Sequence, residues 1–405
     1  MKIGNIVVGQ SGGPTSAINA SLAGVFQAAK DLGAEKIYGM RHGIEGILKE
    51  EFINLSQTLG SDSKVQLLKI TPSSALGSCR YKLPKVEKDE QTYQKIFDIL
   101  KKYDISHFFY IGGNDSMDTI QKLSSYGARI GSNITFIGIP KTIDNDLPLT
   151  DHTPGYGSAA KYIAAATKEV IYDASVYPFP AVTIMEIMGR DAGWLTAASS
   201  LSRGEDCDGP DLIYLPERPF DVEQFVDNVK EKMSQKYAVV IAVSEGLRDA
   251  TGTYICDSLA SKKVDAFGHR QLECTGKALT NMLEVLHCKT RAIELNTLQR
   301  CAAHMLSKTD IDESFQSGYE GVLAASKGET GKMVTFHRIS NTPYQLEYRL
   351  SDINLIANQQ RSVPGKYITK GGTDVSDSIR EYIEPLIQGE YTPQYKNGVP
   401  SYFRF

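Results

Sequence analysis

The chain has 405 residues, of which 41% are hydrophobic and 23% are charged, a balance typical of a folded protein with two or three domains. Lys and Arg number 44 against 48 Asp and Glu, so the formal net charge of −4 disfavours a protein that coats nucleic acid. No run of about 18 apolar residues is present, which excludes a transmembrane helix.

The cysteines and the first residues both favour a cytoplasmic location. Six cysteines are scattered without a CxxC pair, and no His or Cys follows zinc-site spacing, so we expect free thiols in a reducing compartment. The first apolar run, residues 3–9, is shorter than the core of a signal peptide and leads directly into a glycine-rich turn.

Three strand-and-turn units are predicted in chain order. Short apolar runs at 6–8, 108–111 and 136–139 predict buried strands, and each is followed by a polar, mostly glycine-rich turn. Apolar residues at helical spacing follow the first two turns, starting at Ile18 and Met117. Strands that alternate with helices in this way predict parallel βαβ units.

A second set of alternating elements follows without a linker rich in Pro, Gly and Ser. We predict helices over 159–172, 195–201, 222–236 and 277–286 and strands over 182–187, 212–215 and 239–243. The expected fold class is therefore α/β, with two doubly wound, Rossmann-like parallel-sheet domains in close contact. Residues 327–375 are rich in turn signals and predict an irregular insertion or cap, followed by a helix over 376–388.

The first two turns leave their roles open. Ligands of parallel sheets bind beyond the carboxyl ends of the strands, where all three turns lie. Gly12 and Gly13 of the first turn suit an anion held by backbone N–H groups, but steric need alone explains glycines there equally well. Asp115 of the second turn could hold Mg2+ or position a phosphate, or it could cap the following helix.

The third turn favours function over structure. Lys141, Thr142, Asp144 and Asp146 all lie within six residues, whereas a simple turn needs only one Asp or Asn. Alternation along an extended segment would place Asp144 and Asp146 on the same side. One carboxylate could then accept a proton while the other holds a metal.

Residues 140–146, PKTIDND, resemble the PxTIDND signature of the phosphofructokinase family. Further motifs resemble those of this family in the same order: GGNDS at 112–116, MGR at 188–190, SEG at 244–246 and LQR at 298–300. The resemblance covers about residues 3–305 and is greatest to the pyrophosphate-dependent branch. It implies a Mg2+-dependent, reversible transfer of a phosphoryl group from pyrophosphate to the 1-hydroxyl of fructose 6-phosphate.

The same resemblance implies roles for the residues of the third turn. Asp144 corresponds to the general base that takes the proton from the sugar hydroxyl, a role typically worth about 10² to 10⁴ in rate. Thr142 and Asp144 would contact the sugar phosphate. Asp146 and Asp115 would hold Mg2+.

Further residues correspond to the donor and sugar sites of the family. Gly13 would face the donor phosphates, and Arg80 would bridge the phosphates during transfer. Arg291 corresponds to an arginine contributed by a neighbouring subunit, which implies a homo-oligomer, for which we expect a homodimer. The residues implied for the fructose 6-phosphate pocket are Met188, Gly189, Arg190, Glu245, and the segment from Thr297 to Arg300.

Asp115 and Lys141 are the residues that point to pyrophosphate as the donor. The ATP-using members of the family have glycine at both positions, which leaves room for the α-phosphate of the nucleotide. A carboxylate at position 115 would repel that phosphate at close range. Lys141 supplies a compact positive charge to a small, highly charged donor.

Three positions depart from the family pattern. Asn114 replaces a metal-binding Asp of many relatives, so Asp115 is expected to take over that role. Ala181 replaces a second arginine expected to cross between subunits, which gives Arg291 and Arg300 more importance. Thr297 replaces an aromatic residue or His and removes one sugar or phosphate contact.

The resemblance also implies a division into domains. Residues 1–157 with about 296–326 would form a phosphate-donor domain. Residues 158–295 with about 376–405 would form a sugar-phosphate domain, and 327–375 would be the insertion or cap.

Three other functions are alternatives to this one. An ATP-dependent phosphofructokinase or related sugar-phosphate kinase keeps the fold and changes the donor. A binding or regulatory relative without turnover is kept open by Asn114 and Ala181. A nicotinamide-dependent dehydrogenase is disfavoured because no GxGxxG follows the first strand.

Overall fold

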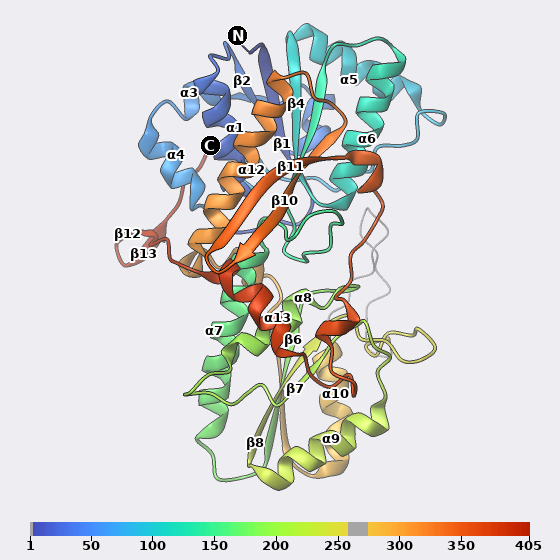
Figure 1. Cartoon of the computed structure of the whole chain (residues 1–405), viewed down its shortest axis with the longest axis vertical. Helices are drawn as coiled ribbons and strands as arrows, with labels where there is room; N and C mark the ends of the chain where they lie inside the picture. Colours follow the sequence, from blue (N-terminus) through green and yellow to red (C-terminus); the bar gives the residue numbers. More distant parts are fainter. Residues whose placement is uncertain (1–2, 258–273) are drawn as a thin grey trace.

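The strands predicted at 6–8, 108–111 and 136–139 lie next to one another in the larger of two main sheets. The computed structural model describes residues 3–257 and 274–405 and has two α/β lobes, one above the other (Figure 1). The larger sheet has the order β11-β10-β5-β4-β1-β2-β3. Its strands are β1 (Asn5–Gln10), β2 (Ile37–Met40), β3 (Phe52–Asn54), β4 (Ile105–Gly112), β5 (Thr135–Pro140), β10 (Lys332–Asn341) and β11 (Tyr344–Asp352).

Helices cover both faces of this sheet, which is parallel except where β3 and β11 pair at its two edges. One apolar cluster lies between the sheet and α1 (Ile18–Asp31), α3 (Leu55–Thr58), α4 (Asp62–Lys69) and α12 (Lys308–Ser326). The other lies beneath α2 (Gly43–Leu48), α5 (Glu90–Lys102) and α6 (Asn114–Arg129).

The smaller lobe has a parallel sheet with the order β7-β8-β6-β9. Its strands are β6 (Ala181–Ile187), β7 (Leu212–Tyr214), β8 (Ala238–Ser244) and β9 (Lys289–Glu294). One face packs against α7 (Tyr156–Ser175), α8 (Trp194–Ala198) and α13 (Asp377–Ile383), and the other against α9 (Val222–Gln235) and α10 (Thr275–Met282). Two sheets, one parallel and one parallel except at its edges, each covered by helices on both faces, confirm the predicted fold class.

The remaining elements are short. Helix α11 spans Leu298–Cys301, and β12 (Gln394–Lys396) pairs with β13 (Val399–Ser401). The 3-10 helices are η1 (Ser199–Ser202), η2 (Leu283–Leu286), η3 (Ala303–Met305), η4 (Ile353–Leu355), η5 (Gly365–Tyr367) and η6 (Glu384–Ile387).

Residues 332–352 differ from the irregular structure predicted for this part of the chain. They form the hairpin of β10 and β11, and β10 joins the larger sheet by pairing in parallel with β5. Only Met333 to Phe336 are buried, and the rest of the hairpin alternates between exposed and half-buried positions. The run of buried residues is therefore too short for its sequence pattern to predict the two strands. The division into three domains stays a prediction.

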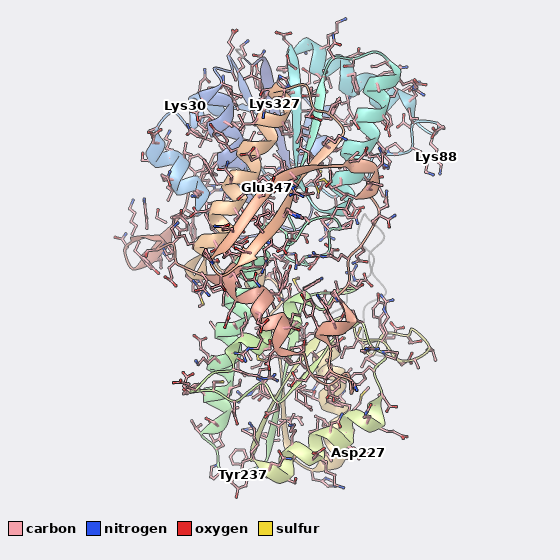
Figure 2. All side chains as sticks on the ribbon, viewed as in Figure 1. Lys30, Lys88, Asp227, Tyr237, Lys327 and Glu347 are labelled. Carbon is pink, nitrogen blue, oxygen red and sulfur yellow. The ribbon has the colours of Figure 1, made fainter. Side chains whose placement is uncertain are left out.

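Charged side chains are exposed on both lobes. Charged side chains such as Lys30, Asp227 and Glu347 project from both lobes (Figure 2). Among the described residues, no helix combines the length and apolar character needed to span a bilayer.

A buried histidine anchors the loop that follows β5. Nδ1 of His152 lies 2.8 Å from Oδ2 of Asp151, and Nε2 lies 2.7 Å from Oε2 of Glu313 on α12. Both partners are carboxylates, so both ring nitrogens are protonated and donate, and the ring is positively charged. Burial lowers the pKa of His152, but Glu313 and Asp151 outweigh burial and raise the pKa to about 9. Arg338 also donates to Asp151, at 2.7 Å, and so ties β10 to this loop.

Helices α1 and α12 approach closely through two glycines. A Cβ on Gly24 would lie 1.9 Å from the backbone oxygen of Phe315, and one on Gly318 would lie 2.1 Å from that of Ser21. Because both obstacles are backbone atoms, no side-chain movement relieves the clash.

We therefore expect Gly318→Ala to destabilise the protein, although alanine favours a helix by about 1 kcal/mol over glycine. Overpacking costs about 1 to 3 kcal/mol, and the helices must also separate. The midpoint of denaturant unfolding should fall, whereas Gly60→Ala, where the nearest atom lies 3.5 Å away, should leave it unchanged. Equal midpoints for wild type and Gly318→Ala would contradict the close contact.

The stabilising effect of His152 should depend on pH in a definite direction. The folded chain holds the His152 proton more tightly than an unfolded chain, whose histidine pKa is about 6.5. The contribution is therefore complete below pH 6.5 and disappears as pH rises through about 9. His152→Gln should lower the unfolding midpoint strongly at neutral pH and much less above about pH 9. The control is His337→Gln, at an exposed position; a pH-independent loss for His152→Gln would disprove the charge assignment.

Candidate active site

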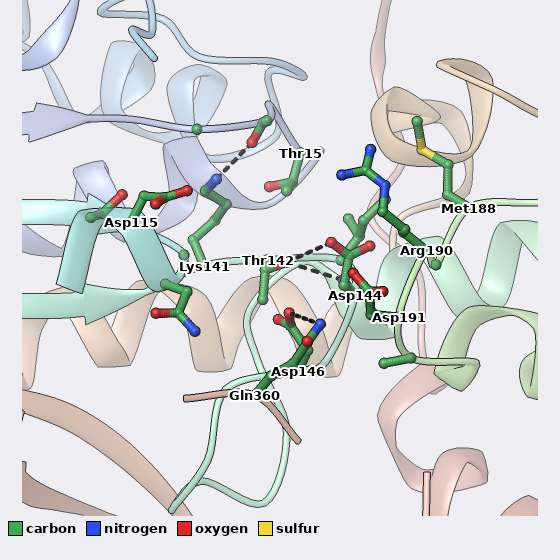
Figure 3. Close-up of a pocket in the computed structure, with 18 of the residues that line it drawn as sticks. Thr15, Asp115, Lys141, Thr142, Asp144, Asp146, Met188, Arg190, Asp191 and Gln360 are labelled. Carbon is green, nitrogen blue, oxygen red and sulfur yellow. Dashed lines mark hydrogen bonds between the residues drawn. The ribbon is translucent and has the colours of Figure 1, made fainter. Parts of the chain in front are cut away.

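A cleft of about 510 Å³ lies between the two lobes. It is formed by the turns that follow β1, β4 and β5 of the larger sheet and β6 and β8 of the smaller one. Figure 3 shows residues from both lobes directed into it. The residues predicted from sequence that line the cleft are Gly13, Arg80, Asp115, Lys141, Thr142, Asp144, Asp146, Met188, Gly189, Arg190, Glu245 and Arg300.

Lys141 joins the third turn to the first. Its side chain is only 2% exposed, and Nζ donates to the backbone oxygen of Gly13 at 2.6 Å (Figure 3). Burial lowers the pKa of Lys141, Asp144 opposes this effect and Arg300 adds to it, and together these influences bring the pKa to about 8. Lys141 therefore places a positive charge at the first turn, where the glycines leave backbone groups accessible.

Asp144 and Asp146 both line the cleft, although the turn is not the extended segment that the sequence suggested. Asn145 between them has φ 54°, in the left-handed region that Asn tolerates better than most residues. The backbone N–H of Asp144 donates to Oγ1 of Thr142 at 3.1 Å. The two carboxylates therefore reach the cleft through a sharp turn rather than through alternation.

Burial and mutual repulsion raise the pKa values of the acidic groups in the cleft. Burial raises the pKa of Asp144, against the positive charges of Lys141 and Arg190. Burial and the neighbouring Asp144 raise the pKa of Asp146 to about 7. The same two causes raise the pKa of Glu245 to about 8. A bound cation would favour the ionised form of each of these groups.

The second turn opens helix α6. Gly113 occupies the N-cap position, so Asp115 lies within the first turn of the helix and lines the cleft, which disfavours the simple capping role. Its charge is favourable there because helix N-termini attract anions. Asn114 faces another segment: its Oδ1 accepts from the N–H of Asn358 at 2.5 Å, and its Nδ2 donates to the oxygen of Gln359.

The smaller lobe supplies positive charge and a backbone turn that requires glycine. Gly189 has φ 128°, and a Cβ there would lie 2.5 Å from the oxygen of Ala192, so the position requires glycine. Its N–H donates to Oε1 of Glu245 at 3.3 Å. The Nε atoms of Arg190 and Arg300 are buried and have no hydrogen-bond partner among the described residues. Buried, unpaired guanidinium N–H groups in a cleft are suited to an anion such as phosphate.

Two predicted residues lie outside the cleft of their own chain. Arg291 lies on β9, about half exposed, and its Nη1 is 3.0 Å from Oδ2 of Asp173. Thr297 precedes α11, is exposed and does not line the cleft. Ala181 is the first residue of β6, at the end of the strand away from the cleft. The roles implied for Arg291 and Thr297 stay predictions.

Sequence reasoning missed one wall of the cleft. Asn358, Gln359 and Gln360 line it, and Nε2 of Gln360 donates to Oδ2 of Asp146 at 3.2 Å (Figure 3). These residues belong to the stretch for which an irregular cap was predicted. The polar run from Asn358 to Arg361 was its only signal, and such runs occur in many surface loops.

The carboxylates of the cleft suit a magnesium ion that keeps part of its water shell. Within residues 3–257 and 274–405, no group of three or more His, Cys, Asp or Glu side chains forms a complete metal cage. Mg2+ commonly binds one or two carboxylates together with substrate phosphates and water. Asp115 and Asp146, on opposite sides of Lys141 in Figure 3, could provide such ligands.

Comparison with known proteins gives a consistent result. Residues 5–308 match the family model for phosphofructokinase. A pyrophosphate–fructose 6-phosphate 1-phosphotransferase of Halomonas elongata is 40% identical over 98% of this chain and 94% of its own. One of Rhodospirillum rubrum is 41% identical over 95% of this chain and 94% of its own. A crystal structure of a pyrophosphate-dependent phosphofructokinase from Nitrosospira multiformis is 37% identical, with a TM-score of 0.88 over 99% of this chain and 96% of its own.

Proposed function

This chain belongs to the phosphofructokinase family, and on that premise we propose that it transfers a phosphoryl group between pyrophosphate and fructose 6-phosphate. The reaction is reversible and yields fructose 1,6-bisphosphate and phosphate. The observation that carries the proposal is the pair formed by Asp115 and Lys141 in a cleft whose size suits a small inorganic donor and a sugar phosphate. The names of relatives about 40% identical over nearly the whole chain support the same donor.

Electrostatics and positioning account for the chemistry. Asp144 takes the proton of the 1-hydroxyl as that oxygen forms a bond to one phosphorus of pyrophosphate. The bridging P–O bond breaks, and the second phosphate leaves with the electron pair. Burial raises the pKa of Asp144, whereas the positive charges of Lys141 and Arg190 lower it and so favour the ionised base. Phosphoryl transfer requires little covalent chemistry from the protein, so the fixed positive charges supply most of the catalysis.

Arginines and backbone groups hold the two substrates. Arg190 and Arg300 direct their unpaired Nε atoms to phosphate oxygens, and Arg80 bridges the phosphates from the larger lobe. Gly13 faces the donor at the first turn, beside the ammonium of Lys141. The sugar lies against the segment from Met188 to Arg190 and against Glu245, whose carboxyl accepts from Gly189.

Magnesium is the cofactor that we assign to this site. Phosphofructokinases generally use Mg2+, and Asp115 and Asp146 would hold it. When bound, the ion neutralises phosphate charge and favours the ionised carboxylates. We further propose a cytoplasmic homodimer, in which Arg291 serves the site of the neighbouring chain, and a donor domain and a sugar-phosphate domain divided as the resemblance implies.

A base variant tests the proposed reaction. With Mg2+ and fructose 6-phosphate, wild type should turn over pyrophosphate much faster than ATP. Asp144→Asn should lower kcat by about 10² to 10⁴, because the hydroxyl proton then has no acceptor. Exposed Asp227→Asn is the matched control and should keep the wild-type kcat. ATP use without pyrophosphate use would overturn the donor, and unchanged turnover by Asp144→Asn would remove its role.

A donor variant tests the reason for the pyrophosphate preference. Replacing both Asp115 and Lys141 by glycine should lower the kcat with pyrophosphate and raise the ratio of ATP to pyrophosphate turnover, because the repulsive carboxylate is gone. A matched double variant, Lys30→Ala with Asp62→Ala, removes an exposed Lys–Asp pair 3.4 Å apart outside the cleft. Thermal unfolding checks that both variants fold. An unchanged donor ratio in the folded glycine variant would show that charge exclusion does not select the donor.

A further inference from the structure

Residues 358–361, which we call the strap, run along one wall of the cleft and end beside the turn that carries Asp144 and Asp146. The strap follows η4 and lies outside residues 5–308, the part of the chain that matches the phosphofructokinase family model. Three hydrogen bonds fasten its backbone to the larger lobe. Asn114 binds the N–H of Asn358 and the oxygen of Gln359, and the N–H of Arg361 donates to the oxygen of Asp146 at 2.7 Å.

The side chain of Arg361 grips the catalytic turn and the loop that follows it. Nη2 donates to both the backbone oxygen and Oδ1 of Asn145, each at 2.8 Å, and Nε donates to the same backbone oxygen at 3.3 Å. Nη1 donates to the backbone oxygens of Thr150 at 2.6 Å and Asp151 at 2.7 Å. A guanidinium has five N–H donors, and this set of contacts uses all five.

Arg361 also connects that turn to the smaller lobe. Its guanidinium carbon lies 4.8 Å from the ring centre of Trp194, and the indole N–H donates to the backbone oxygen of Arg361 at 3.2 Å. Trp194 is 2% exposed and begins helix α8, directly after the segment that lines the cleft from Met188 to Ala192. One residue therefore contacts both lobes beside the cleft.

Arg361 binds the residue of the turn that has a left-handed backbone conformation. Asn145 lies between the two cleft carboxylates with φ 54°, and it is fully buried. A left-handed residue persists only where its surroundings fix it, and here Arg361 binds both its backbone oxygen and its side chain. A released Asn145 would rotate the backbone on either side of it, and hence the directions of Asp144 and Asp146.

We propose that Arg361 is a positioning residue for phosphoryl transfer, which fixes the Asp144–Asn145–Asp146 turn relative to both lobes through its five donors. The inference rests on the proposed function for its effect on turnover, but not for its effect on the turn itself. Arg361 does not line the cleft, so its removal should reduce kcat rather than abolish the binding of fructose 6-phosphate. Misplacement of a catalytic group by about 1 Å can cost about 10² in rate.

The test uses Arg361→Ala and Arg361→Lys in the full-length protein. Arg361→Ala should lower kcat about 100-fold with little change in the KM for fructose 6-phosphate. Added guanidinium ion at millimolar concentration should restore part of that kcat, because the free ion supplies the missing donors. Arg361→Lys keeps the charge but not the planar set of donors, so its kcat should stay low.

A second measurement needs no substrate. Hydrogen–deuterium exchange of peptides spanning 142–155 should speed up in Arg361→Ala, while peptides spanning 182–187 in β6 should exchange as in wild type. Arg380→Ala is the matched control, since Arg380 is a half-buried arginine whose Nη2 donates to the backbone oxygen of Arg203, away from the turn. It should change neither kcat nor exchange at 142–155.

The outcomes separate this inference from the proposed function. Wild-type exchange at 142–155 in folded Arg361→Ala would overturn the positioning role, whatever the substrate proves to be. A kcat loss that Arg361→Lys recovers fully, or that guanidinium leaves unchanged, would also overturn it. If wild type fails to use pyrophosphate, the proposed function fails, and faster exchange at 142–155 still supports the grip of Arg361 on the turn.

Discussion

The ammonium of Lys141 is buried. A buried ion keeps its charge only where nearby groups replace the water molecules that would hydrate it. The carbonyl oxygen of Gly13 replaces one water at 2.6 Å, and Asp144 and Asp146 provide the opposing charge. Burial raises the pKa of both carboxylates, and repulsion from Asp144 raises that of Asp146 further, while the positive groups around them favour the ionised forms. The ionised state of each group in the cleft therefore depends on the other charges. A small polyanion bound with its cation complements these charges better than a bulky nucleotide does.

The fold brings these charges together from positions far apart in the chain. Strand order places the ends of β1, β4 and β5 next to one another, so that three turns share one edge of the larger sheet. The smaller sheet presents the ends of β6 and β8 to the same space. The loop after β5 is also fixed by His152, which does not line the cleft and joins the loop to α12. The site is thus supported by rigid elements on both sides, as phosphoryl transfer requires.

The sequence allowed prediction of the parts of the site that follow local rules. Asp144 and Lys141 lie directly after a buried apolar strand, and a simple turn does not need as many charged residues as theirs contains. Parallel sheet geometry then predicts that this turn meets those of Gly13 and Asp115. The strap could not be predicted in this way, because its contacts join residues more than two hundred positions apart, such as Asn114 and Asn358. The hairpin of β10 and β11 was missed for a related reason: only Met333 to Phe336 are buried and the other residues are exposed or half-buried, so burial leaves little trace in the sequence.

The place of β10 in the larger sheet has a consequence for how the protein is made. β5 ends at Pro140, but its neighbour β10 begins only at Lys332, after the whole smaller sheet. While a ribosome synthesises the intervening residues, β5 presents an open edge whose backbone groups can pair with other chains. The nascent protein therefore carries this unpaired edge throughout the translation of its second lobe. The edge closes only when the last quarter of the chain emerges, and Arg361 follows it, so the site becomes complete close to the end of synthesis.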